Sequence, residues 1–336
     1  MRPTRISSLQ AGVAEDSLTD DVLAGQLGIP VATVAELSRG RLRTTAADGI
    51  GPAALSAGLV PAVLDRRGLA GDSVEFLIFG TNTPDATFPG SSCFLQELLE
   101  LPTIGCLDIR SQCTSFLTAL DTGSRFVASG AYDRVLVVAA DVPTHVLRYD
   151  GVDFDLACLM GDAAAVALVE AGEVGSAGEI LSISTRIDGS RYHEFWCESP
   201  ASRNRIAKGA ARYGRITAED FAAGAMFPKF DANDLRETAL TRAPETFREA
   251  LSQAGLEAVD VTIVAHLLPH VAEELAESLG EAAGRIVFPD TTYSFGSTLP
   301  LTLARAAARS DIADGDLVAL VTAGAGASWG TATLRW

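Results

Sequence analysis

The chain has 336 residues, of which 48% are hydrophobic and 21% are charged, a composition that is ordinary for a folded globular protein. A length of this order corresponds to about two domain-sized units and buries enough surface to fold without disulfides or metals. The formal net charge of −17 argues against a nucleic-acid-binding protein, because such proteins need a basic surface to displace counterions from phosphates.

Targeting signals and metal motifs are not recognisable in the sequence. The N-terminal residues include acidic side chains and no apolar run, which predicts no secretory signal, and no stretch is long and apolar enough to span a membrane. The cysteines are odd in number and lack CxxC spacing, and no Cys/His cluster has zinc spacing. We therefore expect reduced thiols, a cytoplasmic protein, no metal and no membrane association; the cysteines are Cys93, Cys106, Cys113, Cys158 and Cys197.

Blocks of helix, turn and strand occur twice along the chain. A helix ending at 64–69 precedes a strand at 74–79, and a helix at 115–129 precedes a strand at 135–140. Later in the chain, a helix ending at 251–256 precedes a strand at 261–265, and a helix at 297–312 precedes a strand at 317–322. Gly255 follows Gly68 by 187 residues, and Ser297 follows Ser115 by 182. These similar offsets predict a duplicated α/β unit, the alternative being chance similarity between short blocks.

The expected strands are rich in Val, Leu and Ile without polar alternation, which is typical of strands buried on both faces by helices. We therefore predict an α/β protein with two packed halves. The N-terminal half, residues 1–170, carries the candidate nucleophile, and the C-terminal half is 236–336. Residues 171–235 are expected to form a polar insertion, cap and linker, because 185–234 is polar and Arg-rich.

Cys113 is the candidate nucleophile. It follows a short predicted strand at 105–109 and stands at the start of an apolar helix. The positive end of a helix dipole favours a thiolate, which is the reactive form of cysteine. A free cysteine is also commonly a small buried hydrophobe, so position alone leaves both interpretations open.

Several segments resemble the 3-oxoacyl-ACP synthase III family of the thiolase superfamily. The segment DIRSQCTSF at 108–116 resembles the nucleophile segment of that family, and GDAAA at 161–165 resembles its GDGAG turn. Residues 81–85 and 88–93 resemble the segment before a dimer-facing helix, and AGAGASWG at 323–330 resembles FGGGFTWG. The resemblance implies a thiolase fold, with layers in the order helix, sheet, helix, sheet, helix, and supports Cys113 as the nucleophile.

Two histidines compete as the partner of the thiol. His266 follows the predicted strand at 261–265, at the strand end where α/β sites commonly lie, and His270 follows Pro269 at the start of a helix. The family register favours His266 and leaves His270 a capping or packing role. His145 and His193 are expected on the surface.

The resemblance also implies the remaining site residues. Ser297 stands where the family has an Asn that, with the His, stabilises an enolate, and a serine hydroxyl is a shorter, single donor. This substitution puts decarboxylative condensation in doubt and leaves acyl transfer to Cys113 intact. The backbone N–H groups of Cys113 and Ala325 match the oxyanion hole of the family. Phe88 matches a residue that reaches across a two-fold axis toward the acyl pocket of a partner, which predicts a homodimer.

The acyl group is expected to arrive on coenzyme A or on an acyl carrier protein, with no permanently bound cofactor. A cluster of five bases without an acid is a candidate site for phosphates or for an acidic carrier protein, although charge runs are commonly solvated faces. The cluster consists of Arg203, Arg205, Lys208, Arg212 and Arg215.

Three functions remain open from the sequence. The first is a condensing enzyme that acylates Cys113 and forms a 3-oxoacyl product with a second thioester, in polyketide- or fatty-acid-like secondary metabolism. The second is an O- or N-acyltransferase on the same fold that acts on a small molecule. The third is a non-catalytic partner subunit, which the presence of Cys113 disfavours.

Overall fold

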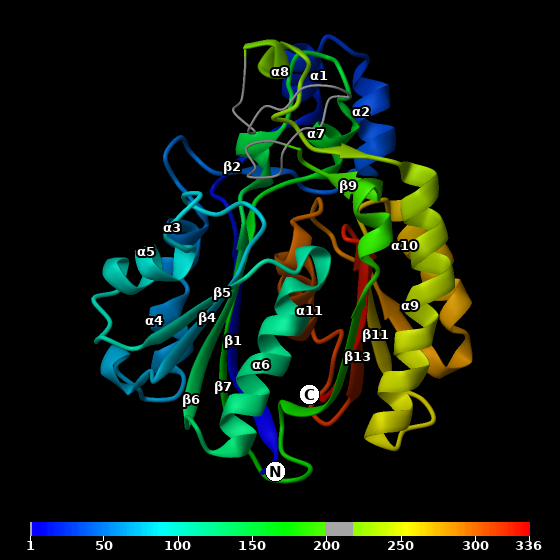
Figure 1. The fold of residues 1–336 in the computed structure, drawn as a ribbon. Coiled ribbons are helices and arrows are strands. Elements are labelled where there is room, and N and C mark those ends of the chain that lie inside the picture. Colours follow the sequence, from blue (N-terminus) through cyan, green and yellow to red (C-terminus); the bar gives the residue numbers. More distant parts are fainter. Residues whose placement is uncertain (1, 199–217) are drawn as a thin grey trace.

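The computed structural model describes residues 2–198 and 218–336. The central element is a ten-stranded sheet with the order β12-β11-β13-β14-β8-β1-β7-β6-β4-β5 (Figure 1). The strands are β1 (Thr4–Val13), β4 (Phe76–Gly80), β5 (Gly105–Ile109), β6 (Arg134–Asp141), β7 (Ala163–Ala171), β8 (Glu179–Ile187), β11 (Val261–Ala265), β12 (Arg285–Val287), β13 (Leu317–Gly324) and β14 (Ser328–Arg335). Two short pairs lie outside it: β2 (Asp16–Ser17) with β3 (Thr44–Thr45), and β9 (Phe195–Trp196) with β10 (Lys229–Phe230).

The sheet consists of two halves with the same topology. In chain order within each half, the spatial order is 3-2-4-5-1, given by β5-β4-β6-β7-β1 and by β12-β11-β13-β14-β8. In both halves the first three strands in this spatial order are parallel to one another. The fourth strand is antiparallel to both of its neighbours, the third and the fifth. Between the two halves, β1 pairs with β8 through Arg5 and Glu179. The predicted duplication of an α/β unit is confirmed.

Helices form the remaining layers. Figure 1 shows α3, α4 and α5 outside the N-terminal half, α9 and α10 outside the C-terminal half, and α6 and α11 between them. The helices are α1 (Asp20–Leu27), α2 (Val31–Ser38), α3 (Pro52–Ala57), α4 (Val60–Asp65), α5 (Ser91–Leu98), α6 (Ser115–Ser129), α7 (Asp155–Leu159), α8 (Ala218–Ala222), α9 (Ala232–Ala254), α10 (Pro269–Leu279) and α11 (Thr298–Ala308). The 3₁₀ turns are η1 (Gly71–Ser73), η2 (Gln112–Thr114), η3 (Pro143–Val146), η4 (Gly189–Glu194), η5 (Glu281–Ala283) and η6 (Phe295–Ser297).

Local sequence explains where the helices next to the site begin and end. The central helix α6 has the predicted bounds and ends at Gly130, whose φ of 79° a glycine adopts without steric cost. The long helix α9 begins after Asp231, whose carboxylate accepts hydrogen bonds from the Asn233 and Asp234 N–H groups. It ends at Gly255, the predicted stop, in the same left-handed conformation. These stops return the chain to β6 and β11, whose carboxyl ends lie near the candidate site.

The division of the chain at 170 and 235 stays a prediction. Within the segment expected to be a cap and linker, β8 is a strand of the central sheet, paired along its length with β14. Among the described residues, no helix has both the length and the apolar character of a membrane-crossing segment.

Candidate active site

Cys113 lies in the turn η2 between β5 and α6, at the entrance to the central helix layer. The residue before it, Gln112, has a φ of 49°, in the left-handed region that non-glycine residues seldom occupy. The Gln112 carbonyl oxygen accepts hydrogen bonds from Asn82 Nδ2 at 3.2 Å and from Ser115 Oγ at 2.7 Å. These contacts fix the backbone that carries the thiol.

The thiol of Cys113 is buried, with 1% of the residue exposed. Burial raises its pKa to about 11, which opposes ionisation. The Tyr293 hydroxyl and the Ala325 N–H lower that pKa by stabilising the thiolate, and the Cys113 N–H acts in the same direction. The buried carboxyl group of Asp141 raises it. The protein groups around the sulfur therefore decide how much thiolate forms.

The end of β13 covers the sulfur from the C-terminal half. A Cβ on Gly324 would collide with Cys113 Sγ, so only glycine allows this approach. Ala325 follows directly and turns its N–H to the sulfur, which agrees with its predicted place in an oxyanion hole. The oxyanion hole itself stays a prediction.

His266 follows β11 and is completely buried. β11 pairs with β13 in parallel, with Ala265 opposite Thr322, so His266 and Gly324 lie at the same end of adjacent strands. The Leu268 N–H donates to His266 Nδ1 at 3.1 Å, which leaves the proton of a neutral ring on Nε2. Nε2 is buried and has no hydrogen-bond partner among the described residues. Burial lowers the pKa of His266 to about 4, so this side chain is a neutral hydrogen-bond donor.

Ser297 ends the turn η6, which packs against the start of α6. A Cβ on Gly296, its neighbour, would lie 2.8 Å from Ser115 Cβ. The Ser297 hydroxyl lies 2.6 Å from the Ser294 carbonyl oxygen and 2.9 Å from Ser294 Oγ. The single hydroxyl proton of Ser297 is therefore donated to Ser294, within the same turn.

Two polar groups at the site were not identified from the sequence: Tyr293, and Asp141 at the end of β6. Asp141 Oδ1 accepts from the Asn82 N–H at 2.7 Å and from the Thr81 hydroxyl at 3.3 Å, whereas Oδ2 is buried without a partner among the described residues. Burial raises the pKa of Asp141 to about 7. Asp141 directly follows the predicted strand at 135–140, and a polar residue at a carboxyl strand end was the available signal. Tyr293 lies in an irregular segment whose sequence carries no such signal.

The other histidines and Phe88 have exposed side chains. His270 is exposed in the first turn of α10, and His145 and His193 are exposed in 3₁₀ turns. Phe88 is 84% exposed. The five bases of the predicted carrier site, Arg203, Arg205, Lys208, Arg212 and Arg215, lie outside the described residues.

The duplicated 3-2-4-5-1 halves around two buried helices, with a cysteine at the start of one of them, define a thiolase-fold protein. The family model described as 3-oxoacyl-[acyl-carrier-protein (ACP)] synthase III matches residues 107–189, and the model of its C-terminal part matches 251–336.

Curated relatives and solved structures agree with this match. A β-ketoacyl-[acyl-carrier-protein] synthase III of Chlorobium chlorochromatii is 31% identical over 283 residues, covering 82% of this chain and 81% of the relative. Its counterpart in Synechococcus elongatus is 30% identical over 289 residues, with 84% and 81% covered. The 3-oxoacyl-(acyl carrier protein) synthase III structure from Pseudomonas aeruginosa shares the fold, with a TM-score of 0.86, 22% identity and coverage of 100% and 98%. The chain belongs to the 3-oxoacyl-ACP synthase III family, whose members are acyl-transferring condensing enzymes.

Proposed function

We propose that this protein is a condensing enzyme that carries an acyl group on Cys113 and joins it to the α-carbon of a second thioester. The Cys113 sulfur attacks the acyl carbon of a coenzyme A or carrier-protein thioester, and the donor thiol leaves. A malonyl-type thioester then loses CO₂, and the electron pair of the broken C–C bond forms an enolate. The enolate carbon attacks the acyl carbon, the bond to Cys113 breaks, and a 3-oxoacyl thioester is released.

The observation that carries this proposal is the convergence of donors on one buried thiol. The Ala325 and Cys113 N–H groups are directed at the sulfur and are suited to stabilise a tetrahedral oxyanion. His266 contributes a neutral Nε2–H at the adjacent strand end, where an enolate oxygen needs a donor. Ser297 occupies the corresponding turn as the third proposed site residue, with its proton bonded to Ser294.

The substrates follow from the family. Relatives named β-ketoacyl-[acyl-carrier-protein] synthase III support an acyl-CoA or acyl-carrier-protein thioester as substrate and no permanent cofactor. We place the reaction in polyketide- or fatty-acid-like secondary metabolism, since the serine at 297 departs from the family pattern. A priming β-ketosynthase of a polyketide biosynthetic pathway shares the fold, with a TM-score of 0.83 and 20% identity. The bases from Arg203 to Arg215 are the proposed contact for phosphates or an acidic carrier protein.

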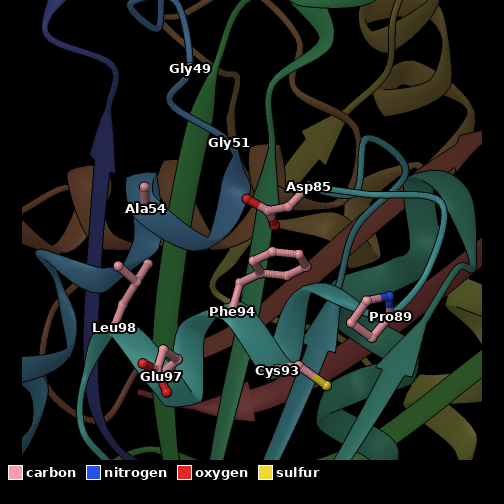
Figure 2. A pocket seen from close by; sticks show the side chains of 9 residues that line it. All are labelled: Gly49, Gly51, Ala54, Asp85, Pro89, Cys93, Phe94, Glu97 and Leu98. Carbon is pink, nitrogen blue, oxygen red and sulfur yellow. The ribbon is translucent and has the colours of Figure 1, made fainter.

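A homodimer is part of the proposal. β5 is an edge strand of the sheet, and an unpaired edge is a template for pairing with a second strand. Large apolar side chains are exposed near this edge: Phe88 (84%), Leu98 (54%), Phe94 (37%) and Leu107 (37%). A hollow of about 400 Å³ lies between α3 and α5, lined by Phe94, Leu98, Pro89 and others (Figure 2). A second copy paired along β5 would cover these side chains.

An acyltransferase that acts on a hydroxyl or amine is the second candidate. The specific observation in its favour is Ser297, because its proton is not free to assist enolate formation. A non-catalytic role is disfavoured by the intact thiol and its donors.

Product analysis separates the two candidates. The protein is incubated with an acyl thioester panel, with and without malonyl-CoA or malonyl-carrier protein, and products are read by mass spectrometry. Condensation predicts a 3-oxoacyl thioester and one CO₂ per product. An acylated Cys113 that yields only esters or amides would overturn the condensing function in favour of the second candidate.

A further inference from the structure

The Tyr293 side chain is held rigidly beside the nucleophile. The Tyr293 N–H donates to the Leu159 carbonyl oxygen at 2.8 Å, and its own carbonyl accepts from the Gly161 N–H at 3.0 Å. The residue is 1% exposed, and its ring packs against Phe295 with centroids 6.4 Å apart. Such anchoring fixes where the hydroxyl points.

The hydroxyl lies near the thiol. A Cβ on Gly324 would lie 3.9 Å from Tyr293 Oη and in collision with Cys113 Sγ, so the two polar atoms flank the same glycine. The hydroxyl is close enough to lower the pKa of the thiol. Burial, together with the neighbouring Cys113, raises the pKa of Tyr293 well above 10. Tyr293 therefore keeps its proton and acts as a donor.

While Cys113 is a neutral thiol, this donor has no acceptor of ordinary geometry among the described residues. Tyr293 Oη is buried and makes no hydrogen bond of ordinary geometry with any described residue. An unsatisfied buried hydroxyl destabilises the folded protein, so a hydrogen-bond acceptor that forms during the reaction would be favoured. The neighbouring Thr322 hydroxyl donates to the Ala265 carbonyl oxygen at 3.0 Å, so its proton is committed to the backbone of β11.

The serine of the neighbouring turn does not compete for this role. Ser297 donates within its own turn, to Ser294. Two buried side-chain donors at this end of the sheet thus have no partner among the described residues: His266 Nε2–H, at the strand end beside Gly324, and Tyr293 Oη–H.

We propose that Tyr293 is a catalytic residue whose hydroxyl donates a hydrogen bond to Cys113 Sγ when the thiol ionises and, after acylation, to the carbonyl oxygen of the second thioester. The first contact stabilises the thiolate. In the second, which rests on the proposed condensation, Tyr293 and His266 together hold the charge that collects on the thioester oxygen as the C–C bond to CO₂ breaks. Tyr293 keeps its proton throughout. The site thereby recovers the second side-chain donor that Ser297 does not supply.

The first test measures the contact with the sulfur and needs no condensation. Tyr293→Phe keeps the ring and removes the hydroxyl. Tyr132→Phe makes the same change in the ring cluster of Phe76 and Phe126, beyond the far end of α6, and is the matched control. Iodoacetamide alkylation of the Cys113 peptide is followed by mass spectrometry between about pH 7 and 9.5. Loss of one donor to a thiolate is expected to raise the thiol pKa by about one unit and to slow alkylation about tenfold in Tyr293→Phe. Identical rates in Tyr293→Phe and the wild-type protein would refute the contact.

The titratable groups that face the thiol could obscure this comparison, so they are controlled. They are Asp141 on β6, His266 after β11 and Tyr293 itself. Asp141 ionises near pH 7 and then opposes thiolate formation, whereas His266 is neutral over the whole range. The tenfold difference between the two proteins is expected to persist in an Asp141→Asn background.

The second test measures the enolate role. Enzyme acylated to one group per chain is mixed with malonyl-CoA, and CO₂ release is recorded. Tyr293→Phe is expected to retain acylation and to lose about 10²- to 10³-fold in kcat, with a smaller change in KM, while Tyr132→Phe stays near the wild-type rate. Unchanged CO₂ release in Tyr293→Phe would refute this role. A wild-type enzyme that is acylated but releases no CO₂ from any malonyl-type thioester would instead refute the proposed condensation, and the alkylation test would still decide the contact.

Discussion

Replacing His266 by alanine tests the assignment of this side chain as a neutral donor. The Leu268 N–H fixes the proton on Nε2, and burial keeps the pKa near 4, so at pH 7 only about one molecule in a thousand carries a protonated ring. Loss of one preorganised donor to an oxyanion costs roughly 3–4 kcal/mol. We therefore expect His266→Ala to lower the rate of 3-oxoacyl product formation by about 10²- to 10³-fold.

The assay separates the two half-reactions. Intact mass reports acylation of Cys113, which is expected to reach one group per chain in His266→Ala, and product formation is measured on the acylated enzyme. His270→Ala is the matched control, because His270 is exposed on the next helix. His266→Asn restores an amide donor and is expected to recover part of the rate.

The pH dependence provides the refuting result. His266 is neutral above about pH 5, so its titration does not produce an acidic limb near pH 6.5 in the pH profile of the wild-type rate. An acidic limb near pH 6.5 that disappears in His266→Asn would show that His266 acts as a base. A larger loss in His270→Ala than in His266→Ala would show that the wrong histidine was chosen.

Three further predictions concern the turn, the interface and the buried carboxyl group. Ser297→Ala is expected to leave CO₂ release from malonyl-CoA near the wild-type rate, because its proton is bonded to Ser294; a 10²-fold loss would contradict this. The wild-type protein is expected to be a dimer by light scattering at micromolar concentration, and Leu107→Asp at the exposed β5 edge is expected to yield monomers, whereas a monomeric wild type would contradict the proposed interface. For Asp141, the folded pKa of about 7 lies above the unfolded value, so its contribution to stability is present below about pH 4 and is lost as the pH rises through 7. The free energy of unfolding of Asp141→Asn minus that of the wild type, measured with urea, is therefore expected to increase by about 4 kcal/mol from pH 4 to pH 8. A difference that does not change with pH would contradict the raised pKa.

The fold was predictable because its elements have strong local signals. The apolar run at 261–265 and the helix at 115–129 have the predicted bounds, since buried parallel strands and a Gly-terminated helix are visible in sequence. The repeat of these blocks predicted the duplication that the 3-2-4-5-1 halves confirm. β8 fell within the segment expected to be a polar cap and linker, because that expectation rested on the polar, Arg-rich composition of 185–234 and not on the alternation of apolar and polar residues in β8.

The site was predictable only where a residue adjoins a regular element. Cys113 and His266 follow predicted strands, so their chain positions indicate the carboxyl edge of a sheet. Tyr293 lies in an irregular segment whose place beside the thiol depends on hydrogen bonds to residues 159 and 161, more than 130 positions away. Likewise, the resemblance to the family aligns Ser297 with a site Asn, but the acceptor of its hydroxyl proton is set by the backbone of its turn.

The central claim is that Cys113 carries the acyl group. Intact mass spectrometry after incubation with a panel of acyl-CoA and acyl-carrier-protein thioesters tests it directly, with peptide mapping of the adduct. We expect one acyl group per chain, located on Cys113, and no adduct on Cys113→Ala. Cys106→Ala is the matched control, because Cys106 is an exposed thiol on the adjacent strand, and it is expected to acylate as the wild type does. A stoichiometric adduct on another cysteine, or acylation that survives in Cys113→Ala, would contradict the account.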